Sequence, residues 1–321
     1  MKTIAFLRLL VAVTSLTAFE VFAQPALTND PGTVEVLPAS SPYGEATAIR
    51  NIPYVTHPTP RQNFDLILPT NKGNQPFPLV VWIHGGAWML GIKEWDNVKY
   101  LVRHGYAIAS IDYRFSTEAP FPTQIQDCNT ALNFILAHAT HYGVSPRRFV
   151  VGGGSAGGHL ALLLGLAREE RDFGADPSNR PLAILDFFGP ADFNRMKDDL
   201  EMIHSEKGLE SFKDAERKLL GAPVEQPSDK AKLASPITYV SAGSPPVLIL
   251  QGGKDDQVPA AQSLRLHEAL NQAGVKNQLI VVDAAGHDGP LFSTPKIESK
   301  VVDFLNGALE KPVQTSAHLP E

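Results

Sequence analysis

Between residues 46 and 310 the chain alternates short, nearly continuous apolar runs with longer amphipathic stretches. The apolar runs are 79–83, 106–111, 149–151, 182–188, 247–250 and 278–282. Runs of this kind are typical of parallel strands that are covered by helices on both faces. Two earlier segments, 46–55 and 63–68, are expected to open the sheet as an antiparallel pair. The pattern therefore predicts an α/β fold with a mostly parallel, eight-stranded sheet.

Hydrophobic residues recur at helical spacing between the predicted strands. The clearest stripes are Ile125, Cys128, Leu132, Ile135, Leu136 and Ala139, and later Leu266, Ala269, Leu270 and Ala273. Cys128 is the only cysteine, which excludes an internal disulfide and any cysteine-rich metal site. Its place in a buried stripe also disfavours a reactive thiol.

The segment 191–244 breaks this rhythm, because it is dense in charge and contains no strong strand. It is expected to form a small helical excursion after the sixth predicted strand. Two interpretations stay open: a pair of solvated surface helices, or a lid that shapes a substrate site. The rest of the chain divides into a lead-in at 24–45 rich in Pro, Ser and Thr, a single domain at 46–310 and a tail at 311–321.

The N-terminus has the features of a secretory signal peptide. Lys2 and Arg8 precede an apolar run at 9–19, and small residues stand before a cleavage point ahead of Gln24. The run is shorter than the roughly 20 residues that a membrane span needs. Residues 1–23 are therefore expected to be removed on secretion, to the periplasm or outside the cell, leaving no stable membrane anchor.

Composition narrows the classes of function. Hydrophobic residues make up 43% of the 321 residues and charged residues 19%, as in globular proteins. The net charge of −6 gives no electrostatic reason to expect nucleic acid as a partner.

A G-x-S-x-G pattern stands at residues 153–157, after a predicted strand and before a helical run. A serine at the apex of such a turn has an exposed hydroxyl, and the flanking glycines remove Cβ atoms that would collide. Ser155 is therefore the candidate nucleophile. The alternative is a turn that only packs the helix on the strand. The glycine spacing does not fit a phosphate-binding loop.

A serine hydroxyl needs a base, and the base needs a group that orients it. Asp255 follows the predicted strand 247–250 and His287 follows 278–282, which gives the chain order Ser, Asp, His. Asp255 is preferred over Asp256 because it begins the D-x-x-V-P turn. His159, four residues after Ser155, is the rival base, and otherwise has a supporting or packing role.

The stretch His84-Gly85-Gly86-Ala87-Trp88 stands at the end of another predicted strand. Backbone N–H groups held by small residues can stabilise the oxyanion of acyl transfer. We expect those of Gly86, Ala87 and Ala156 to do so, and Trp88 to contact the substrate. The alternative is a glycine-rich turn with a structural His84. The sequence contains no metal-binding motif, so no metal or other cofactor is expected.

These motifs together resemble the esterase branch of the α/β-hydrolases. The other matching segments are 63–69, 111–114 with 120–122, 235–239 and 286–287, and the likeness covers roughly residues 46–309. It is closest to the bifunctional feruloyl and acetyl xylan esterases, with the hormone-sensitive-lipase-like carboxylesterases as a broader neighbour. Ala87, Gly154 and the short lead-in depart from the lipase-like pattern and favour an open site.

The resemblance implies a serine esterase that acts on short acyl or aryl esters, such as acetyl or feruloyl groups of plant polysaccharides. The substrate would be a small molecule or a polysaccharide-linked ester. The alternatives are a general short-chain carboxylesterase, an amidase similar to the arylformamidases, and a binding module that has lost the chemistry. The acyl group, the alcohol and the oligomeric state stay open.

Overall fold

The computed structural model of the chain describes residues 32–70, 75–93, 97–221 and 227–309. The predicted signal peptide, the whole of the predicted tail and part of the lead-in lie outside the described residues. Among the described helices, none combines the length and apolar character that crossing a membrane requires.

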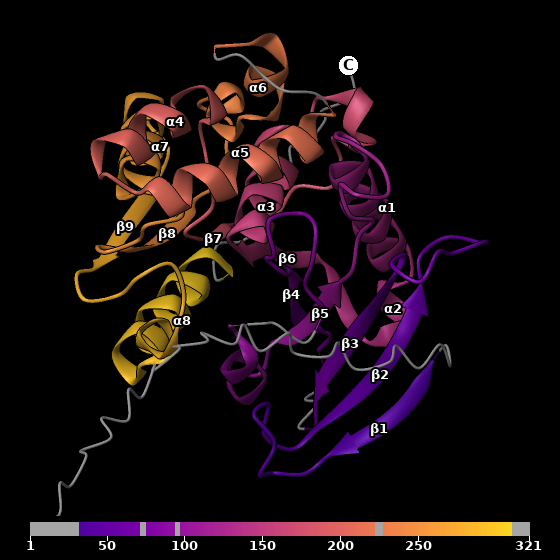
Figure 1. Ribbon diagram of the computed structural model, residues 1–321. Helices are drawn as coiled ribbons and strands as arrows, with labels where there is room; N and C mark the ends of the chain where they lie inside the picture. Colours follow the sequence, from indigo (N-terminus) through magenta and orange to yellow (C-terminus); the bar gives the residue numbers. More distant parts are fainter. Residues whose placement is uncertain (1–31, 71–74, 94–96, 222–226, 310–321) are drawn as a thin grey trace, which may run out of the picture.

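A single mixed sheet runs through the described chain in the order β1-β2-β3-β5-β4-β6-β7-β8-β9 (Figure 1). Its strands are β1 (Thr33–Leu37), β2 (Ala46–Pro53), β3 (Asn63–Pro69), β4 (Phe77–Ile83), β5 (Ala107–Ile111), β6 (Val144–Gly154), β7 (Ile184–Phe187), β8 (Val247–Gly252) and β9 (Asn277–Val282). The first three strands and the β3–β5 pair are antiparallel, and all the other pairs are parallel. The predicted α/β fold, with its opening antiparallel pair, is confirmed.

The predicted strand count of eight was wrong, because β1 adds a ninth strand inside the segment taken as a lead-in. β1 pairs antiparallel with β2 at one edge of the sheet. Its Val34 and Val36 are 64% and 74% exposed. Backbone pairing with β2, rather than burial of side chains, therefore holds this strand in place. The strand contains no long apolar run, so the hydrophobic pattern of the sequence does not reveal it.

Helices cover both faces of the sheet, as predicted. They are α1 (Thr123–Ala137), α2 (Ala139–Tyr142), α3 (Ala156–Leu166), α7 (Ala260–Gln272) and α8 (Pro295–Leu309), with 3-10 turns η1 (Lys99–His104), η2 (Arg171–Phe173), η3 (Pro236–Tyr239) and η4 (Pro290–Ser293). α1, α3 and α7 share one hydrophobic cluster with Val81, whereas η1 and α8 share another with Trp82. Successive residues of β4 thus bury against opposite faces, which explains its continuous apolar run.

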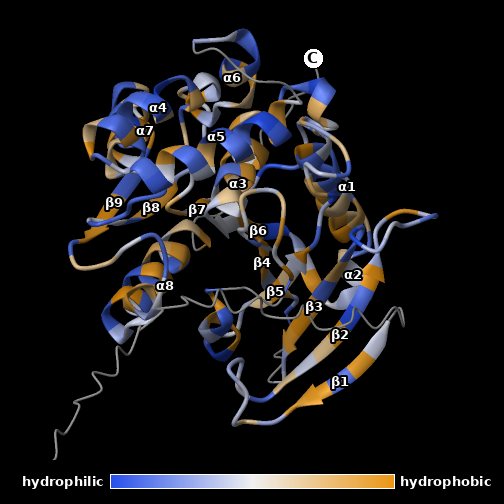
Figure 2. Cartoon of the chain, in the orientation of Figure 1, coloured by the Kyte–Doolittle hydropathy of each residue, from blue (hydrophilic) through white to orange (hydrophobic). Residues whose placement is uncertain are grey.

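The excursion at 191–244 contains α4 (Phe193–Met202), α5 (Glu206–Leu220) and α6 (Asp229–Ala234), grouped at one end of the sheet (Figure 1). Figure 2 shows mostly hydrophilic residues along the visible side of α5. Both ends of α5 are tied down. Ser205 Oγ donates a 2.7 Å hydrogen bond to the Asp256 carbonyl, and the Phe121 N–H donates one of 2.6 Å to the Leu219 carbonyl. The excursion is therefore held against the body of the protein.

Candidate active site

Ser155 lies at the sharp turn between β6 and α3, with φ 55° and ψ −122°. This is a costly backbone conformation for a residue with a side chain. Its N–H donates a 2.8 Å hydrogen bond to the Phe187 carbonyl on the neighbouring strand. A Cβ at Gly157 would lie 2.0 Å from the Ile83 carbonyl oxygen, and one at Gly153 would lie 2.4 Å from Gly157 backbone. Both glycines are therefore required for the turn to approach β4.

Asp255 and His287 reach Ser155 from the loops that follow β8 and β9. His287 Nε2 lies 2.8 Å from Ser155 Oγ, and His287 Nδ1 lies 2.9 Å from Asp255 Oδ2. Parallel strands place their carboxyl ends at one edge of a sheet, which brings these distant residues together. The structure thus forms a hydroxyl–imidazole–carboxylate chain with hydrogen-bond distances throughout.

Asp255 is the better placed of the two adjacent carboxylates. It is 5% exposed, and its Oδ1 accepts hydrogen bonds from the Gln257 N–H at 2.9 Å and the Val258 N–H at 2.8 Å. Gln251 Nε2 donates to its Oδ2 at 3.2 Å. Asp256 is exposed, and its carbonyl binds the start of α5. Asp255 therefore orients His287, and other hydrogen-bond donors hold the Asp255 carboxylate in position.

The loop after β4 takes an unusual backbone path at three consecutive residues. The φ angles are 111° at Gly86, 51° at Ala87 and 58° at Trp88. A Cβ at Gly86 would lie 2.0 Å from the Leu90 carbonyl oxygen, so only glycine fits there. Ala87 and Ala156 line the same hollow as Ser155 and His287. Ala156 opens α3, so its N–H has no carbonyl within the helix to bind.

Trp88 lines the site but is almost completely buried, with only 3% of its surface exposed. Its Nε1–H donates a 3.1 Å hydrogen bond to His159 Nδ1, and His159 Nε2 donates one of 2.7 Å to the Ala234 carbonyl. Burial lowers the pKa of His159 to about 4. Both ring nitrogens are occupied, so the structure gives His159 a supporting role beneath the loop and not the role of a base.

His84 is fully buried at the start of the same loop. Its Nε2 lies 3.2 Å from Asp112 Oδ1, and its ring stacks on Tyr113 with centroids 4.6 Å apart. Gly91 packs directly on the His84 ring, where a Cβ would lie 2.3 Å from Nδ1. The sequence offered His84 only as a structural alternative, and its pairing with Asp112 was not predicted.

Two hollows meet at Ser155 and His287. The smaller has a volume of about 50 Å³ and is lined mainly by apolar residues, among them Trp88, Pro190, Phe212, Ala215 and Val258. The larger has a volume of about 840 Å³ and includes the polar residues Asn97, Lys99, Lys207, Gln257 and Asp288. Ser211 and Gly208 of α5 line both hollows. Residues of the excursion are thus part of the lining of the candidate site.

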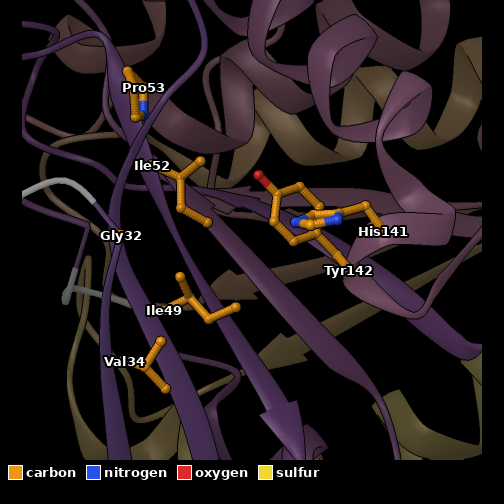
Figure 3. A pocket seen from close by; sticks show the side chains of 7 residues that line it. All are labelled: Gly32, Val34, Ile49, Ile52, Pro53, His141 and Tyr142. Carbon is orange, nitrogen blue, oxygen red and sulfur yellow. The ribbon is translucent and has the colours of Figure 1, made fainter.

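A third hollow lies apart from the triad, between the β1–β2 edge and α2. It has a volume of about 380 Å³, and the side chains of Ile49 and Ile52 point toward the Tyr142 ring (Figure 3). This groove is mostly apolar and contains no serine or cysteine nucleophile. Across the part of the chain that is described, no group of three or more His, Cys, Asp or Glu side chains could hold a metal ion.

Comparisons with known proteins agree with this geometry. A "Truncated form of carbohydrate esterase from gut microbiota" superposes with a TM-score of 0.73 at 27% identity, covering 85% of this chain and 99% of that one. "Esterase LipQ" of Mycobacterium tuberculosis is 31% identical over 209 residues, which are 61% of this chain and 46% of that protein. "Isoprenylcysteine alpha-carbonyl methylesterase ICME" of Arabidopsis thaliana is 25% identical over 251 residues, which are 74% and 56%.

The chain spans about half the length of these two curated relatives. The BD-FAE family model matches residues 64–270, which is more than half of the chain and includes Ser155 and Asp255. The match and the fold confirm the resemblance predicted from the motifs: the chain belongs to the BD-FAE family and has the α/β-hydrolase fold.

Proposed function

We propose that the protein hydrolyses carboxylic esters through an acyl-enzyme on Ser155. The observation that carries this proposal is the continuous hydrogen-bonded chain from Ser155 Oγ through His287 to Asp255, with both contacts under 3 Å. A neutral His287 with its proton on Nδ1, facing Asp255, leaves Nε2 free to accept the serine proton.

In the first half of the reaction, Ser155 Oγ attacks the ester carbonyl carbon while its proton moves to His287 Nε2. The tetrahedral intermediate then expels the alcohol, which takes that proton. In the second half, a water gives a proton to His287 and attacks the acyl carbonyl. The acid leaves, and the proton returns to Ser155 Oγ.

Backbone N–H groups stabilise the negative charge that develops on the carbonyl oxygen in both halves. Those of Gly86, Ala87 and Ala156 are the candidates, because these residues surround Ser155 from the β4 loop and the start of α3. The Met89 and Leu90 N–H groups donate hydrogen bonds of 2.9 and 3.0 Å to the Gly86 carbonyl, which hold the loop in this conformation. Losing one such donor costs roughly 100- to 1,000-fold in turnover.

The substrate class we propose is short acyl or aryl esters, such as the acetyl or feruloyl groups of plant polysaccharides. Two observations support it: a structural neighbour is named as a carbohydrate esterase, and the larger hollow includes polar and charged side chains among its lining residues. Hydroxyl-rich alcohols need such hydrogen-bonding partners.

A second candidate is hydrolysis of methyl esters. One relative is named as a methylesterase, and the small hollow could hold a methoxy group as well as an acetyl group. An amidase activity would use the same triad, so turnover of an aryl formamide beside an aryl acetate separates the two reactions.

The test is steady-state kinetics of Ser155→Ala on p-nitrophenyl acetate, acetylated xylan, methyl ferulate and the methyl ester of a hydrophobic acid. Turnover should fall by roughly a millionfold on whichever ester the wild type hydrolyses. Ester hydrolysis at near-normal rates by this variant would overturn the nucleophile assignment. A wild-type protein that hydrolyses none of these esters would overturn the proposed ester hydrolysis and leave the amidase and the non-catalytic binding module as alternatives.

A further inference from the structure

The helical excursion closes one side of the candidate active site at short range. α5 approaches the Asp255–Val258 loop so closely that a Cβ at Gly208 would lie 2.1 Å from the Asp256 carbonyl oxygen. The Ser205–Asp256 hydrogen bond holds the helix in this position. One turn further along α5, Phe212 faces the small hollow next to Ser155, and Ala215 does so two turns further along.

Phe212 belongs to a chain of aromatic rings that continues behind the site. It is 8% exposed, and its ring lies 5.7 Å from Phe193, whose ring lies 5.6 Å from Trp88. Trp88 is fixed in turn by its hydrogen bond to His159. The wall of the small hollow is thus packed from behind and cannot retreat without a cavity or a rotamer change.

The volume of the small hollow decides what it can hold. At about 50 Å³ it lies far below the roughly 300–1,000 Å³ of sites that take drug-sized ligands, whereas the other hollow, at about 840 Å³, falls within that range. A group of a few heavy atoms fits beside Ser155, but an aromatic acid does not. One side of the substrate must therefore be very small.

The order of the reaction steps indicates which hollow holds the acyl group of the ester and which holds the alcohol. The acyl group stays on Ser155 after the alcohol has left, and a water must then reach the acyl carbon. A large hollow that holds the alcohol gives both an exit for the alcohol and an entry for the water. Its polar residues, including Lys99, Lys207 and Gln257, can bind the hydroxyl groups of an alcohol, and apolar residues such as Leu90 and Phe188 can pack against its carbon skeleton.

We propose that Phe212, assisted by Ala215 and Val258, is the specificity-determining residue that restricts the acyl group to acetyl size. This inference rests on the ester hydrolysis proposed above, and it narrows the substrate class from acetyl or feruloyl esters to acetyl esters. Feruloyl groups are excluded on the acyl side because the Phe212 ring occupies the space they would need.

The test compares kcat/KM for p-nitrophenyl acetate, butyrate and hexanoate. In a hydrophobic pocket one extra methylene changes kcat/KM by about 10- to 200-fold. The wild type should therefore prefer acetate over butyrate by at least roughly tenfold, and methyl ferulate should be turned over at background rates. Phe212→Ala should lower the acetate-to-butyrate ratio by at least roughly tenfold.

Two further variants guard against a simple loss of folding. Phe212→Leu keeps most of the buried surface and should shift the ratio in the same direction, by less. Ala215→Leu fills the hollow and should shift it the opposite way. The matched control is Leu219→Ala, which truncates a fully buried side chain on the same helix that lines neither hollow, and should leave the ratio unchanged.

The outcomes separate this inference from the proposed function. A wild type that hydrolyses all three esters equally, with an unchanged ratio in the Phe212 and Ala215 variants, would overturn the acyl-pocket assignment and leave the esterase proposal intact. So would a wild type that accepts long acyl groups but only methyl alcohols. No hydrolysis of any ester by the wild type would overturn the proposed function itself.

Discussion

Replacing Asp255 by Asn is the sharpest perturbation of the candidate site. Asp255 Oδ1 accepts two backbone N–H groups, so the remaining oxygen of Asn must stay on that side. The new NH2 group then takes the place of Oδ2, 2.9 Å from His287 Nδ1. The retained oxygen also lies 3.1 Å from Nδ1, but it already accepts two backbone N–H groups. A donor at the nearer position therefore favours an Nδ1 that accepts, with the imidazole proton on Nε2, facing Ser155.

A protonated Nε2 cannot remove the serine proton, so turnover should fall by about 10,000-fold. At 1.36 kcal/mol for each factor of ten, this corresponds to about 5.5 kcal/mol of lost transition-state stabilisation. The change also removes one acceptor of Gln251 Nε2, but that group keeps its 3.1 Å hydrogen bonds to the Gly252 and Val258 carbonyls. No buried donor is left unpaired, so we expect the loss of stability to be much smaller than the loss of turnover.

The assay is kcat on p-nitrophenyl acetate, with urea unfolding of the same samples to separate lost stability from lost chemistry. Asp256→Asn is the comparison, because that carboxylate is adjacent in sequence but exposed. We expect a far smaller change there. A folded Asp255→Asn variant within tenfold of wild-type turnover, or a larger loss in Asp256→Asn, would refute the reasoning.

Three other predictions concern groups outside the triad. Burial raises the pKa of Asp186 from 3.8 to about 8, so the folded protein loses stability as pH rises from about 4 to about 8. In the Asp186→Asn variant, the free energy of unfolding by urea should differ less between pH 5 and pH 8 than it does in the wild type. Burial lowers the pKa of His159 from 6.5 to about 4, so stability is lost as pH falls from 6.5 to 4, by roughly 3 kcal/mol. The His159→Gln variant should lack this pH dependence of the free energy of unfolding. An unchanged pH dependence would contradict the conclusion that His159 is buried in its neutral form. Protein recovered from the periplasm or medium should begin at Gln24 by N-terminal sequencing, and an intact Met1 would contradict a cleaved signal.

Local patterns in the sequence identified the parts of the site that depend on short segments. The turn around Ser155 needs Gly153 and Gly157 within four residues, so its glycine pattern is visible in the sequence. Asp255 and His287 each follow a strand of a parallel sheet, and strand order then places them together. The reaction class follows from such local signals combined with a regular fold.

The features that were missed depend on contacts between distant segments. Phe212 lines the site only because Gly208 lets α5 approach the Asp256 carbonyl, a contact that helical periodicity does not encode. The burial of Trp88 depends on His159, 71 residues later in the chain. β1 is held by pairing with β2 and not by an apolar run. The sequence pattern shows which face of a helix or strand is apolar, but not which other segment of the chain packs against that face.

The central claim is that Ser155 is a nucleophile activated by His287. Labelling with a fluorophosphonate, followed by mass spectrometry of the digested protein, tests it most directly. The account predicts one adduct per chain, located on the peptide that contains Ser155, with labelling abolished in Ser155→Ala and slowed by orders of magnitude in His287→Ala. Labelling of another residue, or an equal labelling rate in His287→Ala, would contradict it.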